Sequence, residues 1–143
     1  MPIFALRFPR GLRTPSLHSK RVLLHDGLLA RGLTALLAAE AVTIGRHVFV
    51  TRRAARQIAS RSAAGARLIS HELAHVAQFS REGAARFLLR YVREYARGRR
   101  RGLSHSAAYR AISFEEEAAA AEVDAFDGGG SQDLFEVRRT RGA

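Results

Sequence analysis

The sequence predicts an α+β domain that is mainly helical, with a short strand or hairpin in front of a helix that carries two histidines. Two features support this class. Apolar residues recur at helical spacing in most segments from Val22 onward. Residues 41–50 instead concentrate β-branched side chains on both sides of Gly45, which is typical of a strand with a bulge or of a tight hairpin. The chain has 143 residues, 47% of them hydrophobic, so it can enclose a core of its own.

The two ends of the chain differ in composition from its middle. Residues 1–21 contain all three prolines and no acidic residue, which predicts an irregular basic arm. Residues 128–143 begin with three glycines, which predicts a flexible tail. The domain itself is therefore expected to span residues 22–127.

Helical periodicity is clearest in two segments before residue 80. Leucines spaced through residues 22–39 predict an amphipathic helix. Residues 65–79 are predicted to form a second helix, with Ile69, Leu73 and Val76 on its buried side. The two histidines lie within this second helix.

Three further helices are predicted after residue 80. Residues 82–96 should form a helix whose apolar side consists of Ala84, Phe87, Leu88, Tyr91, Val92 and Tyr95. Ser104 or Ser106 is expected to cap a short helix. Ser113 and Glu116 fit a capping box, which starts a last helix that should end near residue 126.

The chain is strongly basic, with 24 basic and 13 acidic residues and a formal net charge of +11. Helical spacing places Arg86, Arg90, Arg93 and Arg97 in one stripe. Such a surface favours anionic partners, but a run of charges usually forms a solvated helix face. We therefore do not expect nucleic-acid or membrane binding, although the net charge leaves both open.

The absence of cysteine excludes disulfides and thiolate metal sites, so any metal must be bound by His, Asp or Glu side chains. No segment is apolar enough to cross a membrane, and no clean signal peptide is present. We expect a cytoplasmic location by default, with export without a recognisable signal peptide as the alternative.

The segment His71-Glu72-Leu73-Ala74-His75 is the main functional signal. Histidines at positions i and i+4 of a helix point the same way, so both can bind one zinc ion. A carboxylate at the position of Glu72 lies beside the metal without binding it, where it can accept a proton from the attacking water. This is the H-E-x-x-H pattern of zinc peptidases, and it makes Glu72 the predicted catalytic residue.

The two histidines require a third metal ligand, and the acidic residues near the start of the last helix are the best candidates. Glu115 is preferred, while Glu116 and Glu117 also fit a cap or a charge that stabilises the helix dipole. Glu122 lies seven residues after Glu115 on the same helix face and is the fallback ligand. His105 is a further alternative.

The segment from Ser70 to Gln78 resembles bacterial metallopeptidase-like domains with an H-E-L-x-H-V-x-Q motif. These domains are related to the core domain of extracellular contractile injection systems. Residues 41–50 and 108–118 are similar to segments that flank the motif in that group. The resemblance implies a minimal zincin-like fold of the gluzincin type, with a glutamate as the third zinc ligand.

In zincins of that type, the third ligand often stands in an E-x-x-A-D pattern, which maps here onto Glu115-Glu116-Glu117-Ala118. Ala119 takes the position of the aspartate. That acid commonly supports the first histidine through its second ring nitrogen, so its loss is a departure that puts catalytic efficiency in doubt.

Together, these patterns predict a zinc metallopeptidase that cleaves a peptide or protein substrate with zinc-activated water and one zinc ion. A donor for the developing oxyanion is also needed. Tyr109 and His105 are candidates, His47 is a weaker one, and Tyr109 could equally be a packed core aromatic. The alternative function is a catalytically inactive zinc-binding adaptor associated with a bacterial secretion or injection system.

Overall fold

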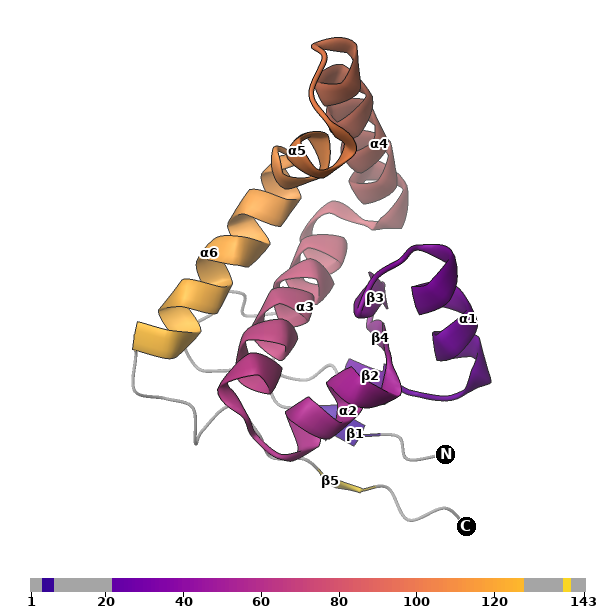
Figure 1. The fold of residues 1–143 in the computed structure, drawn as a ribbon, viewed down its shortest axis with the longest axis vertical. Helices are drawn as coiled ribbons and strands as arrows, with labels where there is room; N and C mark the ends of the chain where they lie inside the picture. The colour runs from indigo at the N-terminus through magenta and orange to yellow at the C-terminus, as the bar shows by residue number, and fades with distance from the viewer. Residues whose placement is uncertain (1–3, 7–21, 128–137, 140–143) are drawn as a thin grey trace.

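The structure is a computed structural model that describes residues 4–6, 22–127 and 138–139. Six helices and five short strands occur in these ranges, with α3 near the centre of the molecule (Figure 1). The elements are β1 (Phe4–Leu6), β2 (Val22–His25), α1 (Leu28–Leu36), β3 (Ala41–Ile44), β4 (His47–Val50), α2 (Arg52–Ala59), α3 (Ala63–Glu82), α4 (Ala84–Arg100), α5 (His105–Arg110), α6 (Ser113–Asp127) and β5 (Arg138–Arg139). No helix in this described part combines the length and apolarity needed to cross a bilayer.

The five strands form one mixed sheet in the order β3-β4-β2-β1-β5. β2 and β4 are parallel, and the other neighbours are antiparallel. β3 and β4 form a tight hairpin, which is one of the two alternatives predicted from the sequence, and Gly45 in its turn has a φ of +63°, which glycine adopts without strain. β3 therefore lies at one edge of the sheet.

The core lies between the sheet and the helices α2 and α3. Alternate residues of β2 and β4 point toward these helices and are buried. Apolar residues on the facing sides of α2 and α3 are buried with them. The cluster includes Val22, Leu24, Val48, Val50, Ile58, Ile69, Leu73 and Val76. α1 lies beyond β3 and β4, on the side away from α3 (Figure 1). A mainly helical α+β domain is therefore what the structure shows.

A second apolar cluster joins α3 to the helices that follow it. Phe79, Phe87, Ile112 and Phe114 are all buried together. The Phe87 ring stacks on the rings of Phe79 and Phe114, with centroids 4.0 and 4.6 Å apart. This cluster fixes α4 and the start of α6 against the C-terminal half of α3, and α6 then runs beside α3 (Figure 1).

The predicted helix over residues 22–39 is only partly correct. Residues 22–25 form β2, because Val22 and Leu24 alternate with less buried neighbours and pair with β1 and β4. The helix α1 starts at Leu28 instead. The sequence also gave no indication of α2, β1 or β5, of which the last two fall inside the predicted arm and tail. The remainder of that arm and tail lies outside the described residues.

The later helices follow the predicted boundaries closely, and Ser104 caps α5 by accepting a hydrogen bond from the Ala107 amide. The capping box at Ser113 is wrong. The backbone N–H of Ser113 donates instead to Glu94 on α4, at 2.7 Å, and the Ser113 hydroxyl donates to the same carboxylate. A carboxylate from another helix therefore replaces the local cap.

The predicted apolar side of α4 is also partly wrong. Phe87 is buried and Tyr91 and Tyr95 pack against the second cluster, as expected. Leu88 and Val92, however, remain 55% and 63% exposed. α4 packs through a narrower stripe than its composition indicated.

Gly65 allows α2 and α3 to approach more closely than any larger residue would permit. A Cβ atom at this position would lie 2.2 Å from the carbonyl oxygen of Gln57. We predict that Gly65→Ala lowers the free energy of unfolding by about 1–3 kcal/mol, because backbone must move to relieve the overlap. The matched control is Gly32→Ala in α1, where a Cβ meets nothing within 4 Å; it should stabilise by roughly 0.5–1 kcal/mol. Chemical denaturation of both variants followed by circular dichroism tests this, and equal effects would contradict it.

Candidate metal centre

Three potential metal ligands converge between α3 and α6. His71 and His75 lie one turn apart on α3, and Glu115 lies in the first turn of α6. The Nε2 atoms of the two histidines are 3.1 Å apart. The carboxylate of Glu115 lies 3.2 Å from His71 Nε2 and 3.4 Å from His75 Nε2. Of the glutamates considered from the sequence, the structure thus brings Glu115 to the histidine pair.

The spacing of these atoms fits a single small cation. A tetrahedral zinc ion with bonds of about 2.0–2.1 Å would hold its ligand atoms about 3.3 Å apart. The two Nε2 atoms are 3.1 Å apart, Oε2 of Glu115 lies 3.2 Å from His71 and Oε1 lies 3.4 Å from His75, and one ligand atom from each residue can be chosen so that all three lie within 4.8 Å of one another. Glu115 and His75 are buried, and His71 is largely so, which limits competition from water. Two imidazoles and one carboxylate are donors that suit zinc and other divalent transition metals.

Both histidines are oriented by a hydrogen bond at the ring nitrogen that faces away from the triad. His71 Nδ1 donates to Glu122 Oε1 at 2.7 Å, and His75 Nδ1 donates to Gln78 Oε1 at 2.8 Å. With Nδ1 as the outer donor, each Nε2 atom faces the shared centre, where the loss of its proton would free a lone pair for a metal. Glu122 therefore supplies the supporting acid that the sequence pattern lacks at Ala119, from one helical turn further along α6.

Glu115 is held by a third hydrogen bond from outside the triad. Tyr91 on α4 donates its hydroxyl to Glu115 Oε1 at 2.8 Å. The pKa of Tyr91 is raised, first by burial and then by the negative charge of Glu115, so the phenol stays protonated as a donor. This contact fixes the carboxylate from the side of α4.

The triad residues also shift one another's pKa values. Burial alone would lower the pKa of His71, but its hydrogen bond to Glu115 and the charges of Glu72 and Glu115 raise it to about 9. The pKa of His75 is raised against the same opposing effect of burial, mainly by Glu115. Burial opposes ionisation of Glu115, yet its hydrogen bonds with both histidines keep its pKa well below the usual range. Glu115 is therefore a carboxylate at neutral pH, the form that binds metal.

Glu72 lies beside the triad and is buried. Thr43 on β3 donates a hydrogen bond to Glu72 Oε2 at 2.7 Å, which connects the edge strand to this carboxylate. Burial raises the pKa of Glu72, while the Thr43 hydrogen bond and the two histidines oppose that shift. Burial therefore makes Glu72 a stronger proton acceptor than an exposed glutamate.

The other residues considered from the sequence lie in different surroundings. Tyr109 contacts the Tyr91 ring edge to face, with centroids 6.3 Å apart, and is partly exposed. Its pKa is raised by burial and by the nearby charge of Glu115, so it remains a proton donor beside the triad. His105 instead bonds to the hydroxyl of Tyr95 at 2.8 Å. His47 pairs with His25 across β2 and β4, with ring nitrogens 3.0 Å apart.

Two of the downstream glutamates, Glu116 and Glu117, lie outside the triad. Glu117 forms a two-point ion pair with Arg81, at 2.9 and 3.1 Å. Glu116 is exposed on α6. Neither belongs to the group of side chains that could hold a metal.

Two contacts of the site, made by Thr43 and Tyr91, are not among those predicted from the sequence. Thr43 could not be found because its contact with Glu72 spans 29 residues and depends on how β3 lies against α3. Tyr91 was assigned only to the apolar side of its helix, although a buried tyrosine hydroxyl usually requires a partner. Glu122 was considered as a ligand, and its shared face with Glu115 was the signal for the supporting role that the structure shows.

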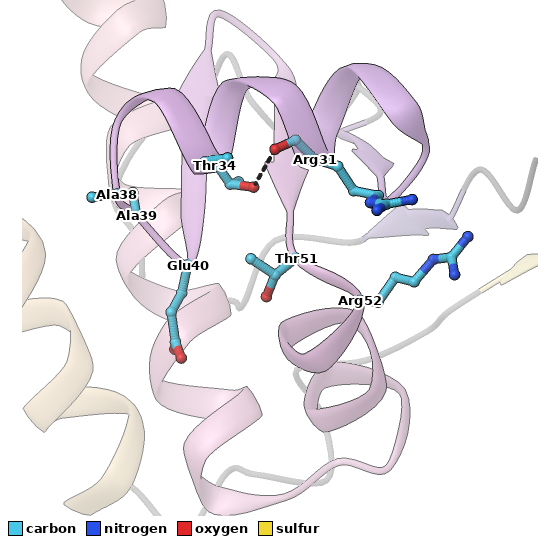
Figure 2. Close-up of a pocket in the computed structure, with 8 residues that line it drawn as sticks. Arg31, Thr34, Ala38, Ala39, Glu40, Thr51 and Arg52 are labelled. Atoms are coloured by element: carbon cyan, nitrogen blue, oxygen red, sulfur yellow. Dashed lines mark hydrogen bonds between the residues drawn. The ribbon is translucent and has the colours of Figure 1, made fainter.

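A separate pocket of about 550 Å³ lies between α1 and the start of α2 (Figure 2). Arg31 and Arg52 extend to one side of this pocket, whereas Glu40 points away from them (Figure 2). Thr34 is buried, but its hydroxyl already donates to the Ala30 carbonyl at 2.8 Å. The polar groups do not converge on one point, so the triad is the better candidate for a functional site.

Comparison with known proteins gives one match. Residues 16–83, just under half of the chain, match the family model of the eCIS core domain. No curated protein and no solved structure matches the chain significantly. The matched segment includes His71, Glu72 and His75, whereas Glu115 and Glu122 lie beyond it. Over this segment the chain is related to the core domain of extracellular contractile injection systems.

Proposed function

We propose that the protein is a zinc-dependent peptidase with a minimal zincin-like centre. The observation that carries this proposal is the convergence of His71, His75 and Glu115, which can each offer one ligand atom within 4.8 Å of the others, with the buried carboxylate of Glu72 beside them. A bound zinc ion would supply Lewis acidity and would lower the pKa of a water molecule. The protein's own residues must then position that water and move its proton.

Glu72 is the residue that would move the proton. In hydrolysis, the oxygen of water attacks the peptide carbonyl carbon, and Glu72 accepts a proton from that water. Glu72 then delivers the proton to the leaving nitrogen as the C–N bond breaks, which returns the carboxylate to its starting state. Thr43 holds Glu72 in place through its 2.7 Å hydrogen bond. Tyr109, protonated and close to Glu115, would donate to the carbonyl oxygen as negative charge develops on it.

The edge strand β3 would bind the substrate. β3 ends the described sheet on one side, and Thr43 connects this strand directly to Glu72. An extended peptide can add to such an edge through backbone hydrogen bonds, largely independent of its sequence. This arrangement would place the peptide backbone along the catalytic carboxylate.

The family match favours a second candidate function. A domain related to the eCIS core could act as a zinc-stabilised adaptor in a bacterial secretion or injection system, without catalysis. In that case the metal would stabilise the contact between α3 and α6, and Glu72 would have no chemical role. The two functions differ in what the loss of Glu72 should do.

We predict that the purified protein contains one zinc ion per chain and that both α3 histidines and Glu115 are needed to retain it. His71→Ala and Glu115→Gln should each lose most of the metal, because two ligands do not hold zinc tightly. The matched controls are His105→Ala and Glu116→Gln, which remove the same groups elsewhere. Elemental analysis of the five proteins is the test. Wild-type zinc in Glu115→Gln would show that another side chain is the third ligand.

Zinc affinity should rise with pH up to about pH 9. His71, with its pKa of about 9, carries a proton at neutral pH that the metal must displace, and this competition weakens as the pH approaches that value. Displacement of the His71 proton alone predicts a gain of about tenfold per pH unit, and displacement of a proton from His75, whose pKa is also raised, would add to this gain. Competition with a chromophoric chelator at pH 7 and pH 8 measures it. An affinity that does not change between these values would contradict the coupling between His71 and Glu115.

Glu72→Gln separates the peptidase from the adaptor. If the protein is a peptidase, this variant should keep its zinc and its fold, since no ligand is lost, while peptide hydrolysis falls by about 10²–10⁴-fold. Activity is measured with a broad fluorogenic peptide library, and Glu116→Gln is the control for a neutralised but remote carboxylate. Loss of zinc in Glu72→Gln would overturn the ligand assignment. Retained zinc with no cleavage by either protein would favour the adaptor.

A further inference from the structure

α4 presents an apolar stripe to solvent that the rest of the described structure does not cover. Leu88, Leu89 and Val92 are 55%, 71% and 63% exposed. They lie together on one helix face, because residues three and four apart are neighbours on an α-helix. The opposite side of α4 packs through Phe87 and Gly98. The exposed stripe is therefore a surface of its own and not the margin of the core.

A row of arginines lies directly beside this apolar stripe. Helical spacing places Arg86, Arg93, Arg97 and Arg100 along one flank of α4, between the apolar stripe and the side that bears Arg90. Arg90 is neutralised by Glu94 at 2.8 Å and also bonds to Ser113. Among the described residues, no carboxylate forms an ion pair with Arg86, Arg93, Arg97 or Arg100. Within the part of the chain that the structure describes, the flank is therefore a strip of positive charge without paired carboxylates.

The position of this helix leaves the strip accessible. The C-terminal end of α4 and the turn into α5 project from one end of the molecule, away from the sheet (Figure 1). Arg99, Arg100 and Arg101 are exposed at this end, next to the partly exposed Leu103. Cations at a helix C-terminus stabilise the helix dipole, but that effect is confined to the last turn. It does not account for Arg86 and Arg93, which lie further toward the N-terminus.

We propose that α4 is a docking surface for an anionic phospholipid membrane. An interfacial helix combines an apolar face with an arginine-rich flank: the apolar side chains enter the headgroup region, and the guanidinium groups bind lipid phosphates. α4 has both parts side by side on one exposed helix. Its charge is complementary to anionic lipid, and the whole chain carries a net charge of +11.

Other occupants fit this surface less well. Single-stranded nucleic acid would need exposed aromatic side chains for base stacking, whereas the exposed apolar residues here are aliphatic. A second copy of the chain would bring the same arginines together. α1 offers a useful contrast, because Leu28, Leu29 and Leu36 are equally exposed without a comparable row of arginines. The combination of the two features is what singles out α4.

Vesicle binding of the full zinc-loaded chain tests the proposal. Phosphatidylcholine vesicles with and without phosphatidylglycerol are the probes, and partitioning is measured by co-sedimentation. We expect binding only to the anionic vesicles, with loss at high salt. The triple variant Arg86→Gln, Arg93→Gln and Arg97→Gln should weaken partitioning by roughly 10²-fold, because each arginine contributes about fivefold. The charge-matched control is Arg52→Gln, Arg53→Gln and Arg56→Gln on α2, which should change it far less.

The contribution of the apolar stripe is tested with two matched double variants, one on α4 and one on α1. Leu88→Ser with Leu89→Ser should weaken binding, whereas Leu28→Ser with Leu29→Ser on α1 should not. All four residues are exposed, so neither variant should lose its fold. Equal losses in the α2 and α4 arginine variants, or no effect of the α4 leucines, would overturn the proposal. Binding to single-stranded DNA that depends on the α4 arginines but not on the leucines, without vesicle binding, would assign the surface to nucleic acid.

A fluorescence signal can place the helix directly in the interface. The chain has no tryptophan, so Val92→Trp introduces a single reporter. Its emission should shift to shorter wavelength on anionic vesicles, as the indole leaves water. Leu36→Trp on α1, at a site 81% exposed, should show no shift. A shift in both variants, or in neither, would contradict docking through α4.

Discussion

The buried amide of Gln78 connects the packing of two helices to the orientation of His75, a candidate metal ligand. Its nitrogen donates to the Phe114 carbonyl at 2.9 Å, and its oxygen accepts from His75 at 2.8 Å. Gln78 is fully buried, so a loss of either hydrogen bond would leave an unsatisfied polar group in the core. The same contact that fixes α6 against α3 thus turns His75 toward Glu115. One side chain thus serves both the packing of α6 and the orientation of His75. The spacing of three residues places Gln78 one helical turn after His75, within reach of its ring.

The grouping of His71, Glu72 and His75 could be predicted from the sequence, because the three residues lie within five positions of one helix, whereas the role of Gln78 as the partner of His75 appears only in the structure. Glu115 followed from a resemblance and from the need for a third ligand. The hydrogen bond from His71 to Glu122, in contrast, could not be predicted from the sequence. Sequence spacing placed it on the same helix face as Glu115, but only the packing of α6 against α3 shows that it meets the outer nitrogen of His71. Glu122 thus reaches the ring of His71 from a position three residues after Ala119.

The fold was predictable where local chemistry decides it. Gly45 and its β-branched neighbours specified a hairpin, and helical periodicity specified α3, α4 and α6. The predictions were wrong where contacts between residues far apart in the sequence determine the structure. The leucines of residues 22–24 suit a helix or a buried strand equally, and pairing with β4 selects the strand. Leu88 and Val92 fit an apolar helix face, yet the stacking of Phe87 between Phe79 and Phe114 rotates that face toward solvent.

Glu72 bears most directly on the choice between catalysis and scaffolding. Burial of a carboxylate is costly unless hydrogen bonds or charges compensate it. Thr43 and the two histidines compensate Glu72 only in part, because its pKa remains raised. A site that only had to hold a metal would be more stable with a neutral residue here. The energetic cost is understandable if Glu72 must take up and release a proton. The same argument gives Thr43 its role, because a hydroxyl from the edge strand holds the carboxylate while leaving its pKa above the usual value.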